Sequence, residues 1–413
     1  MADNVKNSSV KVMIAIDIAK TSHDAVILWP SGRTKTFKFP NTLVGYQNLI
    51  HAAEAPAEDI LVAFEPTADF HRNIAYWLRS QGALCHMVSS LACARAREML
   101  FKSWNKNDKK DARVIMYLMQ QGMMQPFYDP LVNEMLDIQE LANTYYQISL
   151  ARSRCQHSLF NHYLTLFFPE MERFFNSTRA VWFCRFLLKF PTPLSITRYK
   201  KTTFVQRAWE VVGRKVAKQR FLEEMYEVAE QSIALPVPLN SPAIATFKLQ
   251  IRRYLKLTEQ RQQIEEAADQ LISHRDDYQR LRTLPGIGPS IALVIIAESG
   301  DLTRFCHYRQ YLSFCGFNLS ASQSGKQQGH YRLSKRGNAR LRYAFWLAAT
   351  VAIRQRENTF RQKYERYIRA TPDDPDIKRK ARVAVAVKLA RVAHALIKTG
   401  SDYRGYYEFG CET

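Results

Sequence analysis

The sequence predicts an α/β domain at the N-terminus followed by a mostly helical remainder. Three observations lead to this fold class. Short apolar segments separated by turn residues fill roughly the first 90 positions, and long stretches with helical periodicity follow from about residue 130. A content of 46% hydrophobic and 12% aromatic residues is high enough for folded cores. With 413 residues, the chain is long enough for more than one domain.

The N-terminal region combines strand and helix patterns in a defined order. We expect strands at 11–18, 23–29, 34–39, 60–65 and about 85–88, with a hairpin turn at 30–33. We expect helices from a cap at Asn41 to Ala53, from the strand at 60–65 through Arg79, and from about 109 to 121. Antiparallel strands followed by alternating strands and helices predict an α/β domain of the ribonuclease-H type, to which we assign residues 1–126.

Residues 127–275 are predicted to form a helical, coiled-coil-like linker. Two stretches, 130–168 and 243–284, carry helical patterns with many Gln, Arg and Glu positions and few turn residues. We expect long paired helices there, which either join subunits or pack on each other within one chain. Between them, residues 171–243 are rich in aromatic and basic residues; a helical insertion that packs on the linker is the favoured interpretation, and its function is not predicted.

The charge of the chain indicates a polyanionic partner. The 59 Lys and Arg residues against 38 Asp and Glu residues leave a formal charge of +21. Nucleic acid is the first candidate, and a membrane surface is the rival. The N-terminus is polar, and the apolar stretch 381–397 is interrupted by Arg382, Lys388 and Arg391, so no membrane span is expected. Seven cysteines without CxxC spacing favour buried thiols in a reducing compartment. We therefore expect a soluble, cytoplasmic protein with no membrane partner.

Four carboxylates at strand ends and at a helix start are candidate metal ligands. Asp17 ends the first strand, Glu65 ends another, and Asp108 and Asp111 share one face of a predicted helix. In a ribonuclease-H topology these places converge. Clustered carboxylates repel one another unless divalent cations neutralise them, and two Mg²⁺ ions about 4 Å apart can clamp a scissile phosphate. Taken singly, each acid is more simply a surface charge or a helix cap.

The segment Leu284-Pro-Gly-Ile-Gly288 resembles the turn of a helix-hairpin-helix element. Gly286 and Gly288 would let backbone N–H groups approach a phosphate at a helix start, which gives DNA contact without sequence preference. An ordinary Gly/Pro turn between core helices is the alternative.

Residues 302–356 contain ten Lys and Arg residues and no Asp or Glu. Such a stretch is typical of phosphate contact, and binding should weaken steeply with salt. The candidates for nucleic-acid binding are Lys326, Arg332, Lys335, Arg336, Arg340 and Arg342. Within the stretch, Ser322 and Ser324 lie in a flexible loop. A loop serine is usually structural, but a serine surrounded by cations can attack a phosphodiester and conserve the bond energy as a phosphoserine link.

Together these segments resemble insertion-sequence transposases that have a RuvC-like N-terminal domain and a C-terminal transposase domain, relatives of the Piv-type DNA invertases. The N-terminal motif is carried by Ile14-Ala-Ile-Asp17-Ile-Ala-Lys20, Ala63-Phe-Glu65-Pro-Thr67 and Asn105-Lys-Asn-Asp108-Lys-Lys-Asp111-Ala-Arg113. The C-terminal motif is carried by Leu284-Pro-Gly-Ile-Gly288, Gln323-Ser324-Gly325 and Ser334-Lys-Arg-Gly-Asn338-Ala-Arg-Leu-Arg342. The chain departs from the family at Pro66 and Ala68, where a Glu-Ala-Thr-Gly run is common, and in the long insertion.

The resemblance implies a DEDD metal site and a serine nucleophile. Asp17, Glu65, Asp108 and Asp111 would bind Mg²⁺, and Ser324 would attack, with Ser322 as the fallback. Residues 276–413 would form the mostly helical C-terminal transposase domain. The resemblance further implies a tetramer in which the acidic site of one subunit meets the serine of another, and a structured bridge RNA that guides the protein to donor and target DNA.

Three functions remain to be distinguished. The leading hypothesis is RNA-guided DNA recombination through a phosphoserine intermediate. The second is a RuvC-type, metal-dependent DNA junction endonuclease that uses water and the same four acids. The third is a nucleic-acid-binding protein without catalytic activity, in which the acids are structural.

Overall fold

The structure is a computed structural model that describes residues 12–101, 108–129, 135–175, 180–213, 216–320, 332–355 and 358–405. The chain divides into two compact units, Met1–Asn133 and Glu134–Thr413, each of which is described by itself. No helix in these ranges is both long and apolar enough to cross a membrane. Five of the six cysteines within them are buried; Cys306 is exposed, contrary to the expectation of buried thiols.

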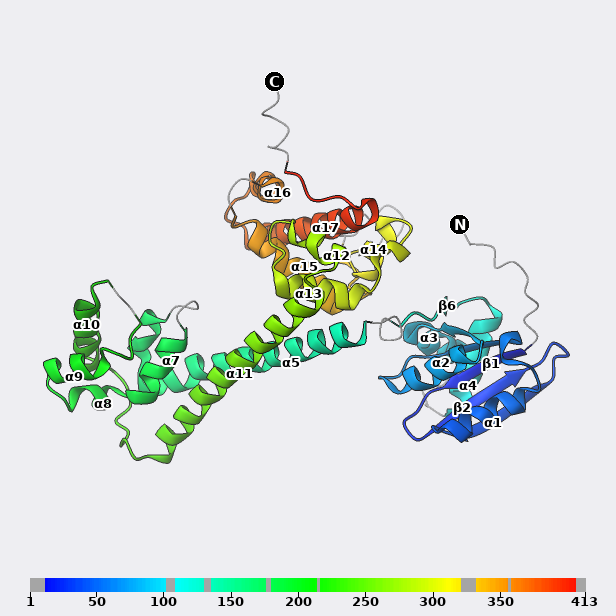
Figure 1. Ribbon diagram of the computed structural model, residues 1–413, viewed down its shortest axis with the longest axis horizontal. Helices are drawn as coiled ribbons and strands as arrows, with labels where there is room; N and C mark the ends of the chain where they lie inside the picture. The colour runs from blue at the N-terminus through cyan, green and yellow to red at the C-terminus, as the bar shows by residue number, and fades with distance from the viewer. Residues whose placement is uncertain are drawn as a thin grey trace, which may run out of the picture. The chain divides into compact units, whose positions relative to one another are not determined.

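The first unit is built on a mixed six-stranded sheet in the order β3-β2-β1-β4-β5-β6 (Figure 1). The strands are β1 (Val12–Asp17), β2 (Ser22–Leu28), β3 (Thr34–Pro40), β4 (Ile60–Phe64), β5 (Leu84–Met87) and β6 (Gln125–Pro126). β1, β2 and β3 form an antiparallel meander, β1, β4 and β5 are parallel, and β6 pairs antiparallel with β5. The predicted α/β class of this domain is confirmed.

Helices cover both faces of this sheet. They are α1 (Leu43–Ala53), α2 (Phe70–Ser80), α3 (Ser90–Phe101) and α4 (Asp108–Gln120), with a 3-10 turn at Ala57–Asp59. Ile14, Ile16 and Val62 point to the face covered by α1 and α2. Ala15 and Ala63 point to the opposite face, against α3 and α4. The faces alternate because successive residues of a strand point to opposite sides.

Three local features differ from the sequence prediction. Thr42, not Asn41, is the N-cap of α1, because its side chain accepts the Gly45 N–H. Asn41 instead bridges to the preceding loop by donating to the Lys20 carbonyl. α3 and β6 were not predicted. α3 buries only Cys93 and Ala96, so its apolar stripe is too narrow to produce a clear helical period.

Two long antiparallel helices organise the second unit (Figure 1). α5 (Leu136–Ser158) continues through a π-helical segment (Leu159–Leu164) and α6 (Thr165–Phe167), and its partner is α11 (Pro242–Ile272). Near one end, Ala142 and Ala268 share a core. Further along, Arg152 donates to the Tyr254 hydroxyl at 2.9 Å and stacks over its ring. The two helices therefore pack on each other within the chain.

The insertion is helical and packs on this pair. It contains a 3-10 turn (Pro169–Phe174), α7 (Ala180–Lys189), α8 (Pro193–Thr197), α9 (Lys201–Ala208) and α10 (Lys218–Glu230). Its core is aromatic, with Phe186, Phe190 and Phe204 in mutual contact, and it includes Phe247 and Tyr254 of α11. Pro169 and Pro193 lie in the first turn of the 3-10 turn and of α8, where a missing N–H leaves no helical hydrogen bond unmade.

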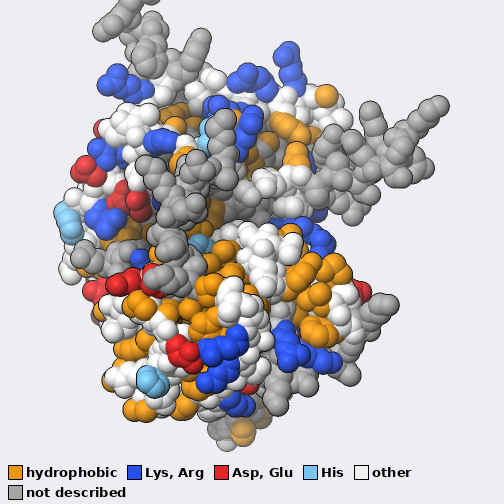
Figure 2. Space-filling view, turned by 90° about the vertical axis from the view of Figure 1, so that its right-hand side faces the viewer, with side chains coloured by type: hydrophobic (Ala, Val, Ile, Leu, Met, Phe, Trp, Pro, Cys, Tyr) orange, Lys and Arg blue, Asp and Glu red, His pale blue; other side chains and the backbone are white. Residues whose placement is uncertain are grey.

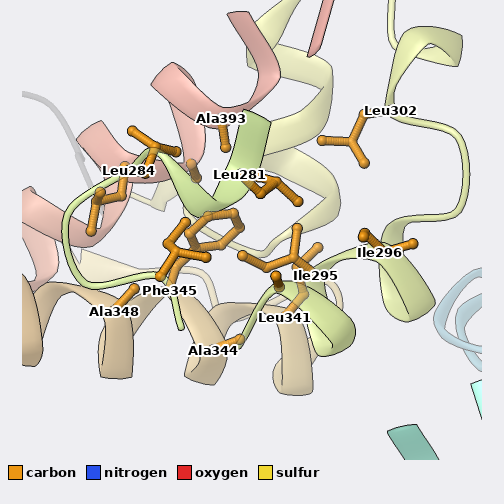
Figure 3. Packing of buried hydrophobic residues seen from close by; sticks show 14 of the residues in the cluster. Leu281, Leu284, Ile295, Ile296, Leu302, Leu341, Ala344, Phe345, Ala348 and Ala393 are labelled. Carbon is orange, nitrogen blue, oxygen red and sulfur yellow. The ribbon is translucent and has the colours of Figure 1, made fainter. Parts of the chain in front are cut away.

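A bundle of helices completes the second unit. It comprises α12 (Asp276–Arg282), α13 (Pro289–Ser299), a 3-10 turn (Leu302–Arg304), α14 (Tyr308–Phe314), α15 (Ala339–Ala352), α16 (Thr359–Ile368) and α17 (Pro375–Thr399), with a small hairpin of β7 (Leu319–Ser320) and β8 (Arg332–Leu333). Side chains from several helices converge in its core (Figure 3). Buried alanines on α15 and α17, among them Ala348 and Ala390, allow close helix packing. The predicted helical character of this region is confirmed.

Gly286 is required by this packing. Its φ of +86° lies in the left-handed region, and a Cβ there would overlap the Ala348 carbonyl oxygen and lie 2.9 Å from the Ala352 nitrogen. Gly288, two residues later, has a φ of −85°, and a Cβ at this position would have as its nearest neighbour the flexible Arg282 side chain, 3.9 Å away. The two glycines of the turn therefore differ in their structural role.

We expect Gly286→Ala to lower the free energy of unfolding by about 3 kcal/mol or more, because it combines backbone strain with a clash against α15. Gly288→Ala is the matched control and should change it by less than about 1 kcal/mol. Urea unfolding of both variants measures the difference. Equal stability of the two would show that the turn adapts to a side chain at Gly286.

Candidate functional site

Asp17 and Glu65 lie beside each other at the carboxyl edge of the sheet. β1 and β4 are parallel, with Ile16 opposite Phe64, so the next residue of each strand is one of these acids. Ala15 and Ala63, two residues earlier, face α3 and α4. Because side chains alternate along a strand, Asp17 and Glu65 belong to that same face. The sequence prediction that these two strand ends converge is consistent with this register.

Asp111 reaches the same face from α4. α4 packs on β1 and β4, and the Asp111 side chain is 7% exposed. Its carboxylate accepts a hydrogen bond from Arg97 Nε at 2.6 Å, and the Arg97 side chain on α3 is 14% exposed. The guanidinium therefore supplies positive charge to Asp111 within a nearly buried pair, which matters because an uncompensated buried charge is strongly destabilising.

Cys93 connects Glu65 to this pair. It lies one helical turn before Arg97 on α3 and close to the Glu65 carboxylate. Burial, and then the neighbouring Glu65 carboxylate, raise the pKa of the Cys93 thiol to about 12. The thiol stays protonated at neutral pH, so it can donate to Glu65. Arg97 and Cys93 were missed by the sequence reasoning because α3 was not predicted.

Asp24 is a further acid on this face that the sequence reasoning did not single out. It lies opposite Asp17 in the β1–β2 pairing, and residues opposite each other in an antiparallel pair share a face. Its side chain is almost fully buried, and Lys38 Nζ lies 3.6 Å from it. Asp24 therefore has a cation of its own, whereas Asp111 relies on Arg97.

The four predicted metal ligands are only partly described. Asp108 is the first residue of α4, three positions before Asp111, but its side chain lies outside the described residues. Among the side chains that are described, no three from His, Cys, Asp and Glu form a group that could hold a metal ion. Asp17, Glu65 and Asp111 nevertheless offer carboxylate oxygens, the donor type that Mg²⁺ prefers.

The predicted serine site lies mostly outside the described residues. Ser322, Ser324 and Lys326 belong to the segment that joins β7 to β8, and the side chain of Arg332 is likewise not described. The hairpin itself is set by Leu319 opposite Leu333. The structure therefore leaves the identity of the nucleophile as a prediction.

The motif from Ser334 to Arg342 forms the turn into α15. Gly337 has a φ of +137°, and a Cβ there would lie 2.5 Å from Gly316 N and from Phe314 O, so this position needs glycine. Asn338 caps α15 by accepting the Leu341 N–H at 3.0 Å. Gly337 and Asn338 therefore set the conformation and the position of the turn into α15.

The cations of this motif differ in their availability. Arg340 forms an ion pair with Glu298 at 3.2 Å and stacks over Tyr146, and Arg342 donates to the Cys315 and Lys335 carbonyls. The remaining two, Lys335 and Arg336, are exposed. On the face of the molecule in Figure 2, Lys and Arg side chains are spread over several separate places.

A pocket of about 730 Å³ opens beside the turn at residues 284–288. Its lining includes Tyr145 and Arg261 of the long helix pair, Arg282, and the start of α13 at Ser290. The Arg261 guanidinium lies 5.2 Å from the centre of the Tyr145 ring. Gly286 and Gly288, the predicted backbone contacts for phosphate, both border this pocket together with Arg282, whereas Arg261 is ion-paired with Glu265 at 3.0 Å.

Comparisons with known proteins find similarity to transposases in two parts of the chain. Residues 14–169 match the model of a transposase family of the IS110 DEDD type, and residues 278–365 match the model described as the transposase IS116/IS110/IS902 family. The first match covers the sheet domain, and the second covers the turn at 284–288 and α15. Both models describe transposases.

Individual relatives agree with these matches. An uncharacterized protein of insertion element IS110 from Streptomyces coelicolor is 23% identical over 98% of both chains. An uncharacterized protein of insertion element IS116 from Streptomyces clavuligerus is 25% identical over 61% of this chain and 62% of its own length. The transposase for IS1111A from Coxiella burnetii is 31% identical over 34% of this chain and 38% of its own length. The chain thus spans under two thirds of the last two relatives.

Over residues 14–169 and 278–365, the chain is thus similar to transposases of the IS110/IS116 type.

We expect Arg97→Met to lower the free energy of unfolding by about 3–5 kcal/mol when no divalent metal is present, because it leaves Asp111 buried without its counter-charge. Adding Asp111→Leu to the same chain should restore most of the loss, since neither charge is then buried alone. Thermal unfolding of the two variants in EDTA measures both effects. A single variant as stable as the original protein would mean that water already solvates Asp111.

Proposed function

We propose that this protein is a DNA transposase that cuts and rejoins strands through a phosphoserine intermediate. The observation that carries the proposal is the placement of Asp17, Glu65 and Asp111 on one face of a mixed six-stranded sheet, in a chain whose residues 278–365 match a transposase family. DNA would be its substrate, and the positive net charge of +21 supports contact with a polyanion.

The acidic site would hold Mg²⁺ through Asp17, Glu65, Asp108 and Asp111. When bound, such an ion polarises a phosphate and stabilises charge on the entering and leaving oxygens. Arg97 already donates a hydrogen bond to one carboxylate oxygen of Asp111. When a metal ion binds, Asp111 would therefore have to contact both the ion and Arg97, or lose its bond to Arg97. The protonated Cys93 thiol beside Glu65 would help to orient that carboxylate.

Ser324 would provide the nucleophile. Its Oγ forms a bond to phosphorus while one P–O bond of the DNA strand breaks, and the serine proton passes to the leaving strand oxygen. Rejoining reverses these steps, with a strand hydroxyl attacking the phosphoserine and the proton returning to Ser324. The number of P–O bonds is unchanged, so the reaction needs no ATP. The exposed Lys335 and Arg336 would hold neighbouring phosphates.

The proposal includes a guide RNA and a tetramer, which the motif resemblance supports. A structured bridge RNA would pair with donor and target DNA, so that the protein contacts mainly backbone. In the tetramer, the acidic site of one subunit would act with the serine of another. Sedimentation equilibrium at several concentrations, with and without the RNA that copurifies, measures the assembly.

We expect a covalent protein–DNA adduct at Ser324 when the protein, with its copurifying RNA, is mixed with DNA that spans the joined ends of its element in Mg²⁺. Ser324→Ala should abolish the adduct and leave DNA and RNA binding unchanged, and Ser322→Ala is the matched control. Peptide mapping by mass spectrometry locates the link. Metal-dependent cleavage without any adduct would instead favour the hydrolytic junction endonuclease.

We expect cleavage in Mg²⁺ to stop in EDTA, and Asp17→Asn or Glu65→Gln to remove it as well. Neither substitution should lower the melting temperature of the metal-free protein, because each removes a like charge from a cluster of carboxylates. Calorimetry checks stability, and gel assays check cleavage. A large fall in melting temperature would make these acids structural, and cleavage that persists in EDTA would exclude the metal mechanism.

A further inference from the structure

The insertion carries an exposed basic cluster formed at the ends of the three helices α7, α8 and α9. The cluster consists of Lys189 in the last turn of α7, Arg198 after α8, Lys200 before α9 and Arg207 in the last turn of α9, and all four side chains are exposed. Residues 185–220 contain ten Lys and Arg residues and one acid, Glu210. The acids of the insertion lie mainly on α10.

Tyr199 holds the two arginines of the cluster together. Both guanidinium carbons, of Arg198 and of Arg207, lie 4.6 Å from the centre of the Tyr199 ring. Arg198 also donates to the Tyr199 hydroxyl at 2.6 Å, and Lys189 Nζ donates to the Arg207 carbonyl at 2.7 Å. The Tyr226 hydroxyl fixes the backbone of Tyr199 by donating to its carbonyl. The cluster is therefore arranged before any partner arrives.

The cluster has no acidic partner in the described part of the chain. Two other cations of the same region are paired, Arg173 with Glu224 and Lys201 with Glu227, each at 2.7 Å. No ion pair within the described residues involves any of the four cluster members. Their positive charge is thus available to an external anion, whereas that of Arg173 and Lys201 is already balanced.

Helix geometry alone does not account for this arrangement. A cation near a helix C-terminus interacts favourably with the helix dipole, which explains one basic residue at each end. It does not explain two guanidinium groups over one ring, where like charges repel at low ionic strength. An external anion that contacts both groups would relieve this repulsion.

We propose that the basic cluster binds the sugar–phosphate backbone of a nucleic-acid duplex. Guanidinium groups match the geometry of phosphate oxygens, and the Tyr199 ring is covered by arginines rather than open for a base to stack on. The contact would therefore depend on charge and not on sequence. This inference goes beyond the proposed function, because it assigns a role to the insertion and is independent of how strands are cut.

The test compares two double variants of the full-length protein. Arg198→Gln/Arg207→Gln removes two charges from the cluster, and Arg173→Gln/Lys201→Gln removes two paired charges from the same region. Fluorescence anisotropy follows binding to a DNA duplex of unrelated sequence, and to an RNA duplex of the same sequence, at several salt concentrations. We expect the cluster variant to bind at least one duplex about tenfold more weakly and to reduce its salt slope by about two, with less than a twofold change in the control.

Several outcomes would overturn the proposal. The first is unchanged affinity of the cluster variant for both duplexes. The second is an equal loss of duplex affinity in both variants. The third is a loss of affinity seen only for anionic phosphatidylserine vesicles measured in parallel. Circular dichroism checks that each variant is folded. If the arginine variant does not fold, Lys189→Gln/Lys200→Gln provides the second measurement, and an unchanged salt slope there also overturns the proposal.

Discussion

The parallel pairing of β1 with β4 is the constraint on which the acidic site depends. It sets Asp17 and Glu65 side by side, and the alternation of each strand directs both toward α3 and α4. A shift of the β1–β4 register by one residue would turn one of the two carboxylates toward the apolar layer beneath α1 and α2. The buried apolar residues on both faces of the sheet therefore fix the register and, with it, the place where the acids gather.

Much of this arrangement could be predicted from the sequence, because it depends on patterns that are local. The apolar strands and the acids at their ends are adjacent in the chain, so their order indicates the ribonuclease-H-type topology. The Arg97–Asp111 pair could not be predicted in this way. Arg97 lies on a helix with a narrow apolar stripe, and nothing in its spacing from Asp111 indicates contact. The choice of Thr42 over Asn41 as a cap depends on backbone geometry that both residues could satisfy.

The basic stretch in the C-terminal region illustrates a different limit. From the sequence, its cations are equivalent candidates for phosphate contact. In the structure, Arg340 and Arg342 are engaged by Glu298 and by turn carbonyls, and Gly337 and Asn338 shape the start of α15. Some residues of a motif that resembles a binding sequence are thus explained by their role in the folded structure. Charge content predicts the kind of partner, and the internal contacts decide which cations remain for it.

The antiparallel arrangement of α5 and α11 has a consequence for how this protein could change in evolution. The chain leaves the C-terminal core along one helix and returns along the other, so the ends of the insertion meet on neighbouring helices. A segment inserted there can be lengthened, shortened or replaced while α5 and α11 keep their mutual contacts. The far end of this helix pair is therefore a position at which the chain can vary in length without rebuilding the domain that carries the transposase motif.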